Sequence, residues 1–217
     1  MYLPAHFEEK RTDVLHALIR SHSLGTLVTL NTASELQANP IPFLVEPGPQ
    51  AHGTLRGHVA RANPMWRETR GDVDALVVFQ GAQSYVSPGW YPSKAEHGKV
   101  VPTWNYIVAQ ARGRLRAIDD AVWLRALVAR LTDRFEAPQA RPWGIGDAPA
   151  DYIETMLRAI VGIEIEIGAL VGKWKVSQNR NQADRDGVAT GLAAQALQAD
   201  DAQAAAMAAA VAQRSAG

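Results

Sequence analysis

Alternation of apolar and acidic side chains in residues 162–176 constrains the fold more than any other feature of the sequence. Ile163, Ile165 and Ile167 would point to one side of an extended strand. Glu164 and Glu166 would point to the other side. This pattern is typical of a half-buried β-strand rather than of a helix. We therefore predict one long strand here, late in the chain.

Several shorter strands are expected before it. Pro40 and Pro42 place one of them at a sheet edge or a bulge, because proline has no N–H to donate to a neighbouring strand. Residues 83–87 should pair back on 75–80 as a hairpin across Gly81-Ala82. The predicted strands are 26–31, 38–45, 55–60, 75–80, 83–87 and 104–118.

Helical patterns stand at the start of the chain and again late in it. Residues 6–22 carry acidic side chains early, basic ones late and an apolar face, which suits one helix. Two more helices are expected at 119–135 and 151–160, separated by a loop rich in proline and glycine. Short strands first, helices late and a closing strand predict a mainly β, α+β fold, a small antiparallel barrel with helical additions.

Alanine dominates residues 187–217. Alanine favours helix, but burial of methyl groups alone stabilises a helix only slightly. We expect a helix that docks weakly, or docks on a partner subunit.

Composition excludes several classes of protein. The chain of 217 residues has 22 lysines and arginines against 22 aspartates and glutamates, which argues against a broad basic surface for nucleic acid. It has no cysteine, so disulfides and cysteine-ligated metals are ruled out. No signal peptide and no apolar run long enough to span a membrane are visible, and a cytoplasmic protein is expected.

Residues 57–66 combine a strand end, a helix start and a cation. Asn63 is a favourable N-cap residue and Pro64 a favourable first helical residue. Free N–H groups there, beside Arg61, would form an anion site. A well-capped helix with a solvated arginine explains the same residues, so the spacing leaves both interpretations open.

Two aromatic-rich segments follow. Residues 84–92 hold two serines and three aromatic rings among prolines and a glycine, which suits a planar ligand or a loop packed on itself. In residues 99–106, Trp104 and Tyr106 share one strand face and Asn105 lies on the other. Asn105 can donate and accept at once, as a flavin edge requires, although a core amide is the alternative.

Residues 172–180 end the last predicted strand with three cations, one indole and three neutral polar side chains. This set could neutralise a phosphate or a ring that carries negative charge. A solvated basic strand end is the alternative. The six histidines show no metal-binding spacing, and neither a metal site nor catalytic residues are predicted.

In this order, the segments resemble the PaiB family of negative transcriptional regulators. The resemblance extends over about residues 1–192, and the alanine-rich tail beyond Leu192 departs from it. The motifs that carry it are Met1-Tyr2-Leu3-Pro4 with Phe7, 58–64 with Trp66, 85–91, 90–94, 101–106, 162–166 and 173–180.

The resemblance implies a split β-barrel of the FMN-binding type, related to pyridoxamine-phosphate-oxidase-like proteins. It implies a homodimer with FMN at the subunit interface. The barrel domain would occupy residues 1–186, with inserted helices, and 187–217 would form a helical tail.

The resemblance also assigns residues to the flavin. Arg61 and Asn63 would hold the phosphate, and residues 58–60 would run beside the isoalloxazine. Trp104 and Asn105 would form a pocket wall, and the segment from Lys173 would close the site from either subunit. The implied FMN-binding residues are His58, Val59, Ala60, Arg61, Asn63, Trp104, Asn105, Lys173, Trp174, Ser177, Gln178 and Arg180.

Three functions stay open at this point: an FMN-binding regulator, a flavin-dependent oxidoreductase acting on a small molecule, and a barrel without flavin whose aromatic rings fill its own core. Neither net charge nor motif supports DNA binding, because the late helices 119–135 and 151–160 are not joined by a tight turn.

Overall fold

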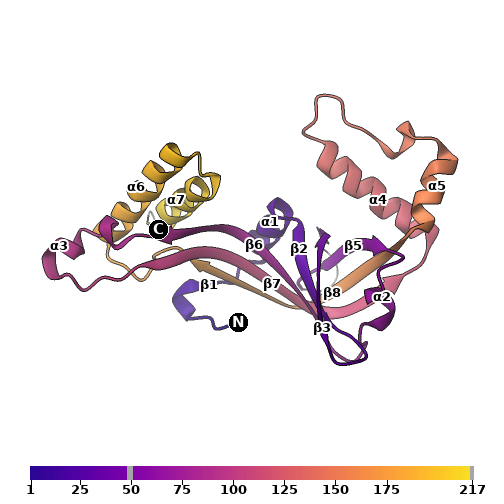
Figure 1. The fold of residues 1–217 in the computed structure, drawn as a ribbon, viewed down its shortest axis with the longest axis horizontal. Helices are drawn as coiled ribbons and strands as arrows, with labels where there is room; N and C mark the ends of the chain where they lie inside the picture. The colour runs from indigo at the N-terminus through magenta and orange to yellow at the C-terminus, as the bar shows by residue number, and fades with distance from the viewer. Residues whose placement is uncertain (48–50, 216–217) are drawn as a thin grey trace. The chain divides into compact units, whose positions relative to one another are not determined.

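The computed structural model in Figure 1 describes residues 1–47 and 51–215. The chain forms two compact units, and three long strands contribute residues to both. Unit 1 comprises Met1–Leu15, Gln80–Ala109 and Val171–Gly217, and unit 2 comprises His16–Phe79 and Gln110–Leu170.

All eight strands belong to one antiparallel sheet. Its order is β3-β2-β6-β7-β8-β5-β4, and β1 pairs with β8. The strands are β1 (Glu8–Glu9), β2 (Leu24–Leu30), β3 (Leu36–Pro42), β4 (Leu44–Glu46), β5 (Thr54–Ala60), β6 (Ala75–Val86), β7 (Thr103–Ile118) and β8 (Ile160–Lys175).

A single bent segment closes the barrel. β3 pairs with β2, and after a break at Phe43 the chain continues as β4, which pairs with β5. The two ends of the strand order are therefore one piece of chain. The predicted edge at Pro40 and Pro42 lies at this bend, and a Cβ at Gly57 would lie 2.9 Å from the Pro42 carbonyl oxygen. The fold is the predicted split antiparallel barrel with added helices.

The alternation that defined β8 matches the burial in unit 2. Ile163, Ile165 and Ile167 are all buried in the core. Glu164, on the opposite face, is buried as well, because the guanidinium of Arg56 approaches its carboxylate to 2.7 Å and that of Arg116 to 3.5 Å.

The predicted helices occur in the predicted order, but the first of them begins later in the chain than predicted. The predicted first helix, 6–22, is shortened to α1 because Glu8 and Glu9 pair with β8 instead. The helices are α1 (Thr12–Ser21), α2 (Met65–Glu68), α3 (Ser93–His97), α4 (Ala121–Glu136), α5 (Ala150–Arg158), α6 (Gln182–Ala199) and α7 (Ala202–Ser215), with 3-10 turns at Ala5–Phe7, Pro88–Trp90 and Ile145–Asp147.

The hairpin predicted across Gly81-Ala82 is also wrong. β6 runs through both residues without a turn. Both are buried, so the alternation of buried and exposed side chains changes phase there. β2 pairs with residues 76–78 of β6, and β7 is the neighbour of β6 on the other side. The pairing of β6 with its neighbours in the sheet outweighs the local turn preference of glycine.

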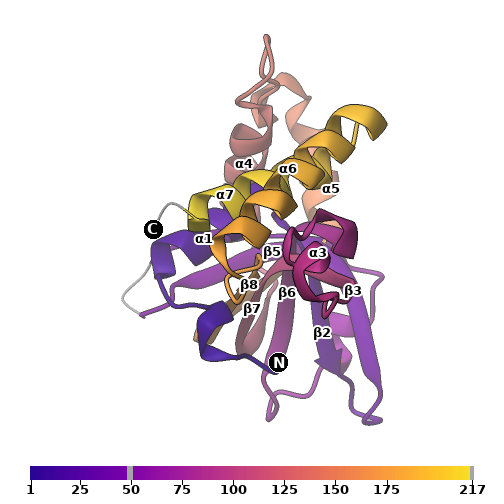
Figure 2. The same ribbon diagram turned by 90° about the vertical axis from the view of Figure 1, so that its left-hand side faces the viewer.

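The alanine-rich tail forms two helices rather than one. Figures 1 and 2 show α6 and α7 side by side. Val188 and Leu192 of α6 and Met207 of α7 are fully buried, so the tail has an apolar face that its alanine content conceals. No helix in residues 1–47 or 51–215 has the length and apolar character to cross a membrane.

α6 also makes close contact with the connection between β6 and β7. A Cβ at Gly191 would lie 2.4 Å from the Trp90 ring, and one at Gly187 would lie 2.1 Å from the Trp90 carbonyl oxygen. Asp184 accepts hydrogen bonds from Ser93 through the backbone N–H at 3.1 Å and the hydroxyl at 2.8 Å. The helix thus fixes this connection in place.

Candidate functional site

The first group of predicted site residues lies in unit 2, at the end of β5. His58, Val59, Ala60 and Asn63 line one cavity of about 370 Å³. Asn39, Pro40 and Ile41 of β3 and Ile160 at the start of β8 complete its wall. Four of the predicted flavin-binding residues are therefore brought together around one hollow.

His58 carries an unsatisfied polar atom in this cavity wall. Its Nδ1 is buried and has no hydrogen-bond partner among the described residues. Burial lowers the pKa of the His58 imidazole, so the ring is neutral near pH 7. An unpaired buried ring nitrogen costs about 1–3 kcal/mol, so a polar ligand edge bonded to it would be favoured.

Asn63 lies one residue before Pro64, which is the N-cap of α2, so the prediction of Asn63 as the N-cap is wrong by one residue. Its Oδ1 accepts the backbone N–H of Met65 at 3.0 Å, and its Nδ2 donates to Oδ1 of Asn39 at 3.0 Å. The helix starts at Met65, one residue later than expected, and consists of Met65–Glu68 alone. One turn offers few free N–H groups, so its N-terminus is no anion site by itself.

Arg61 is engaged in structural contacts. Its guanidinium donates two hydrogen bonds to the Asp119 carboxylate, one to the Arg158 carbonyl at 2.7 Å and one to the Ile160 carbonyl at 3.1 Å. Arg158 is the last residue of α5, so the cation stabilises the negative end of that helix. Asp119 raises the pKa of Arg61, and Arg61 lowers the pKa of Asp119.

The second group lies in unit 1, around the turn that follows β8. Asn105 and Ser177 are both buried, and Asn105 Nδ2 donates to Ser177 Oγ at 2.9 Å. Ser177 has a left-handed backbone, with φ of 66°. Gln178 fixes the turn, since its Oε1 accepts the Val176 N–H at 2.8 Å and its Nε2 donates to the Trp174 carbonyl.

Three cations surround this turn. Lys173 is buried, donates to the Tyr2 carbonyl at 3.1 Å and lies 5.2 Å from the Tyr106 ring centre. Lys175 lies 5.9 Å from the same ring and donates to the Trp104 carbonyl at 2.6 Å. The third cation, Arg180, is stacked 4.7 Å above the Tyr91 ring.

These cations, Lys173, Lys175 and Arg180, lack opposite charges. None of them forms an ion pair within the part of the chain that the structure describes. The pKa of Lys175 is lowered, mainly by burial and further by repulsion from Lys173 and Arg180. A bound anion would relieve both effects.

Lys175 and Tyr91 are absent from the residues that the resemblance assigns to the flavin. Lys175 is two residues from Lys173, a spacing that puts both on one strand face and could have indicated a joint role. Tyr91 lies in the aromatic-rich segment 84–92, but only the folded chain shows that it stacks with Arg180.

A further hollow in unit 1 is lined by the exposed side of β6 and β7. Its volume is about 310 Å³, and Trp104 and Tyr106 form part of its wall. Trp104 is 55% exposed and packs edge-on against Tyr85, with ring centres 6.1 Å apart. As predicted, Trp104 and Tyr106 lie opposite Asn105 on the strand.

Residues 1–169 match the model of a protein family described as "Putative FMN-binding domain". The chain belongs to this family. An uncharacterized protein of Emericella nidulans is 36% identical, over 88% of this chain and 90% of its own length. The Bacillus subtilis protein PAI 2, named for protease synthase and sporulation, is 29% identical over 85% of both chains, which confirms the relation to PaiB.

Solved structures support the fold. A conserved hypothetical protein of Mycobacterium tuberculosis superposes with a TM-score of 0.58 at 10% identity, over 83% of this chain and 94% of that one. At this level of identity, the likeness concerns the arrangement of strands and helices and not the ligand.

Proposed function

We propose that this protein binds FMN. Membership of the family supports a flavin ligand, and the observation that carries the proposal is the group of three unpaired cations, Lys173, Lys175 and Arg180, beside aromatic rings. A phosphate would supply the missing negative charge, and a planar ring system suits aromatic neighbours. FMN combines both chemical features in one molecule.

We assign the phosphate to Lys175 and Arg180 rather than to Arg61. Lys175 is a cation whose charge is disfavoured by its surroundings, so an anion gains most there. Arg61 would have to leave Asp119 and the end of α5 before it could bind a phosphate. Asn63 is likewise occupied by Asn39 and Met65.

The cavity in unit 2 is suited to a heterocycle edge. The unpaired Nδ1 of His58 can accept or donate one hydrogen bond, and Val59 and Ala60 supply apolar wall. Within unit 1, Asn105, whose amide donates to the Ser177 hydroxyl, is a separate candidate for contact with a ring edge. When bound, the flavin would supply hydride or electron transfer, while these residues orient it and exclude water.

Flavin uptake is tested by mixing the purified protein with excess FMN, removing unbound flavin on a desalting column and recording the absorption spectrum. A yellow protein fraction with stoichiometric flavin supports the proposal. A colourless fraction, together with unchanged FMN fluorescence on titration with protein, would contradict it. Bovine serum albumin at the same concentration controls for unspecific adsorption.

We also propose a cytoplasmic homodimer with the flavin at the subunit interface, as the resemblance implies. The exposed Tyr85–Trp104 pair and exposed Leu24 and Leu36 offer apolar surface for a second copy. Light scattering coupled to size exclusion measures the mass directly. A mass of one chain at micromolar concentration, with and without FMN, would rule the dimer out.

A regulatory role is the further proposal that follows from the relation to PaiB. The zero net charge gives DNA binding little support. α4 and α5 are separated by residues 137–149, so they do not form a helix-turn-helix. Gel-shift titration of genomic fragments at moderate salt tests the role, and failure to retard any fragment, with or without FMN, would count against it.

A flavin-dependent oxidoreductase is the second candidate. The hollow beside Trp104 and Tyr106 favours it, because a small substrate needs open space next to a bound ring. Anaerobic mixing of the flavin-loaded protein with NADH or NADPH should then bleach the flavin absorbance. Inertness toward both nucleotides would argue against this activity.

A further inference from the structure

A separate cavity of about 480 Å³ lies in unit 2, between the first turns of α4 and the last turns of α5. Its volume falls within the range of small-ligand sites, about 300–1,000 Å³. Leu124 and Leu157, which are buried against Ile153, contribute to its lining. None of the wall residues except Arg61 belongs to the predicted flavin site.

The wall includes an apolar side chain that is exposed to solvent. Val122, on the first turn of α4, is 81% exposed and lines the cavity together with Leu124 and Leu157. Covering an exposed valine with an apolar group is favourable because it removes apolar surface from water. The apolar wall is therefore suited to the hydrocarbon body of a ligand.

The charges around this apolar surface are unequal. Arg125 of α4 and Arg158 of α5 form no ion pair within residues 1–47 and 51–215. Asp119 also lines the cavity, but Arg61 neutralises it. The Arg158 guanidinium donates one hydrogen bond, to the Thr155 hydroxyl at 2.9 Å, which leaves its charge unpaired. Against the charges of Arg125 and Arg158 stands a single acidic side chain in the lining, Glu154. The excess of one positive charge favours an anionic head group.

We propose that this cavity binds a small amphipathic carboxylate. Its aliphatic or aromatic body would cover Val122, Leu124 and Leu157, and its carboxylate would accept hydrogen bonds from Arg125 and Arg158. Guanidinium and carboxylate groups match in charge and geometry, which makes arginine the preferred partner. The site goes beyond flavin binding and does not depend on it.

Three probes of equal chain length separate charge from apolar contact. Isothermal titration of the flavin-free protein with octanoate should show one saturable site. Octanol, without the charge, and octylamine, with the opposite charge, should each bind at least about tenfold more weakly, since neither can accept a charge-assisted hydrogen bond through a carboxylate. Equal affinity for all three, or no saturation by octanoate, would overturn the proposal.

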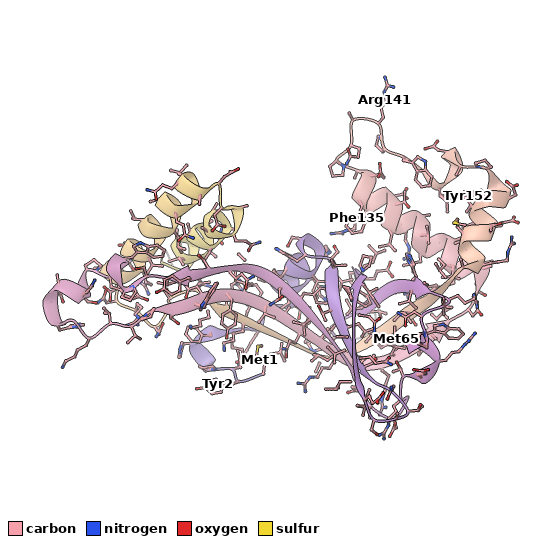
Figure 3. All side chains as sticks on the ribbon, viewed as in Figure 1. Met1, Tyr2, Met65, Phe135, Arg141 and Tyr152 are labelled. Atoms are coloured by element: carbon pink, nitrogen blue, oxygen red, sulfur yellow. The ribbon has the colours of Figure 1, made fainter. Side chains whose placement is uncertain are left out.

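Two variants locate the site. Arg125→Gln with Arg158→Gln should weaken octanoate binding about tenfold or more, because both charged donors are lost. Arg141→Gln is the matched control, since Arg141 lies at the tip of the loop between α4 and α5 and does not line the cavity (Figure 3). Equal losses in the double variant and the control would overturn the site. All of these side chains are exposed, and unchanged thermal unfolding verifies the fold.

The two proposals fail separately. Absence of octanoate binding leaves flavin uptake untouched, because the titration uses flavin-free protein. Absence of flavin uptake leaves the titration with octanoate unaffected for the same reason.

Discussion

Arg61 in unit 2 and the cations of unit 1 were expected to serve one ligand, but their surroundings differ. Arg61 donates to a carboxylate and to two backbone carbonyls, so its charge is balanced within the fold. Lys175 and Arg180 face aromatic rings, a hydroxyl and a carbonyl, and neither has an ion-pair partner in the described chain.

This difference separates structural cations from cations available to a ligand. A balanced arginine holds two elements together, here the end of β5 and the end of α5. An unbalanced group of cations is unfavourable in the free protein and becomes favourable when an anion binds. We therefore propose that Lys175 and Arg180, rather than Arg61, bind the phosphate.

The largest effect is expected from Lys175→Gln combined with Arg180→Gln. Loss of two charge-assisted hydrogen bonds should weaken FMN binding by about 100-fold. Fluorescence titration measures the affinity. Lys99→Gln, an exposed lysine of the same unit, is the control and should leave it unchanged. If the double variant bound FMN as tightly as the wild type, the comparison would fail.

Gly191→Ala should have the next largest effect. The added Cβ would meet the Trp90 ring at 2.4 Å, and overpacking of this kind costs about 1–3 kcal/mol of unfolding free energy. Trp90 precedes Tyr91, on which Arg180 stacks, so FMN binding should weaken as well. Urea denaturation measures the stability, with exposed Thr190→Ala as control. A stable Gly191→Ala variant would show that α6 does not hold this loop.

A decrease in pH tests a carboxylate of unit 1, Glu9, whose charge is paired with those of arginines. Hydrogen bonds from Arg11, together with Arg11 and Arg214 as charges, lower the pKa of Glu9 to about 2, against an ordinary 4.5. Stability from this carboxylate is complete above pH 4.5 and is lost as the pH falls toward 2. Over that pH range, the midpoint temperature of thermal unfolding should fall more steeply for the wild type than for Glu9→Gln. Parallel curves would refute the assignment.

Arg61→Ala and Asp119→Asn test the structural role of the balanced pair. Both variants should lower the midpoint of thermal unfolding modestly, because each breaks the ion pair. Arg61→Ala should lower it more, because it also removes the hydrogen bonds to the Arg158 and Ile160 carbonyls. Neither should alter the ratio of FMN to riboflavin affinity. A selective loss of FMN affinity in Arg61→Ala alone would return the phosphate to Arg61.

The smallest effect concerns alkaline pH. The pKa of Lys175 lies below its ordinary value, so the lysine loses its proton, and its attraction for phosphate, earlier than a solvated lysine would. FMN affinity relative to riboflavin should therefore decline as the pH rises from 7 toward 10, and the decline should be weaker in Lys175→Gln. Identical profiles would exclude Lys175 as a phosphate partner.

Local patterns were sufficient to predict most strands. The alternating isoleucines of β8 are an example, because a local pattern of period two is enough to indicate a strand and its buried face. The start of α1 and the continuity of β6 depend on pairing with distant strands. A helix pattern at Glu8 and a turn pair at Gly81-Ala82 were misleading for that reason.

The site residues were predictable as types but not as partners. Asn105 and Ser177 were both singled out, yet their hydrogen bond joins residues 72 positions apart. Asp119 lies 58 positions from Arg61, and no local pattern links the two residues. Whether a cation has an ion-pair partner depends on which distant residues the fold brings next to it. Sequence alone therefore could not separate a structural arginine from a ligand-binding one.

Binding of a phosphate by the unpaired cations of unit 1 is measured most simply with two flavins that differ only in that group. Wild-type protein titrated with FMN and with riboflavin, at low salt and neutral pH, should bind FMN at least about tenfold more tightly. Equal affinities, or no saturable binding of FMN, would contradict the claim.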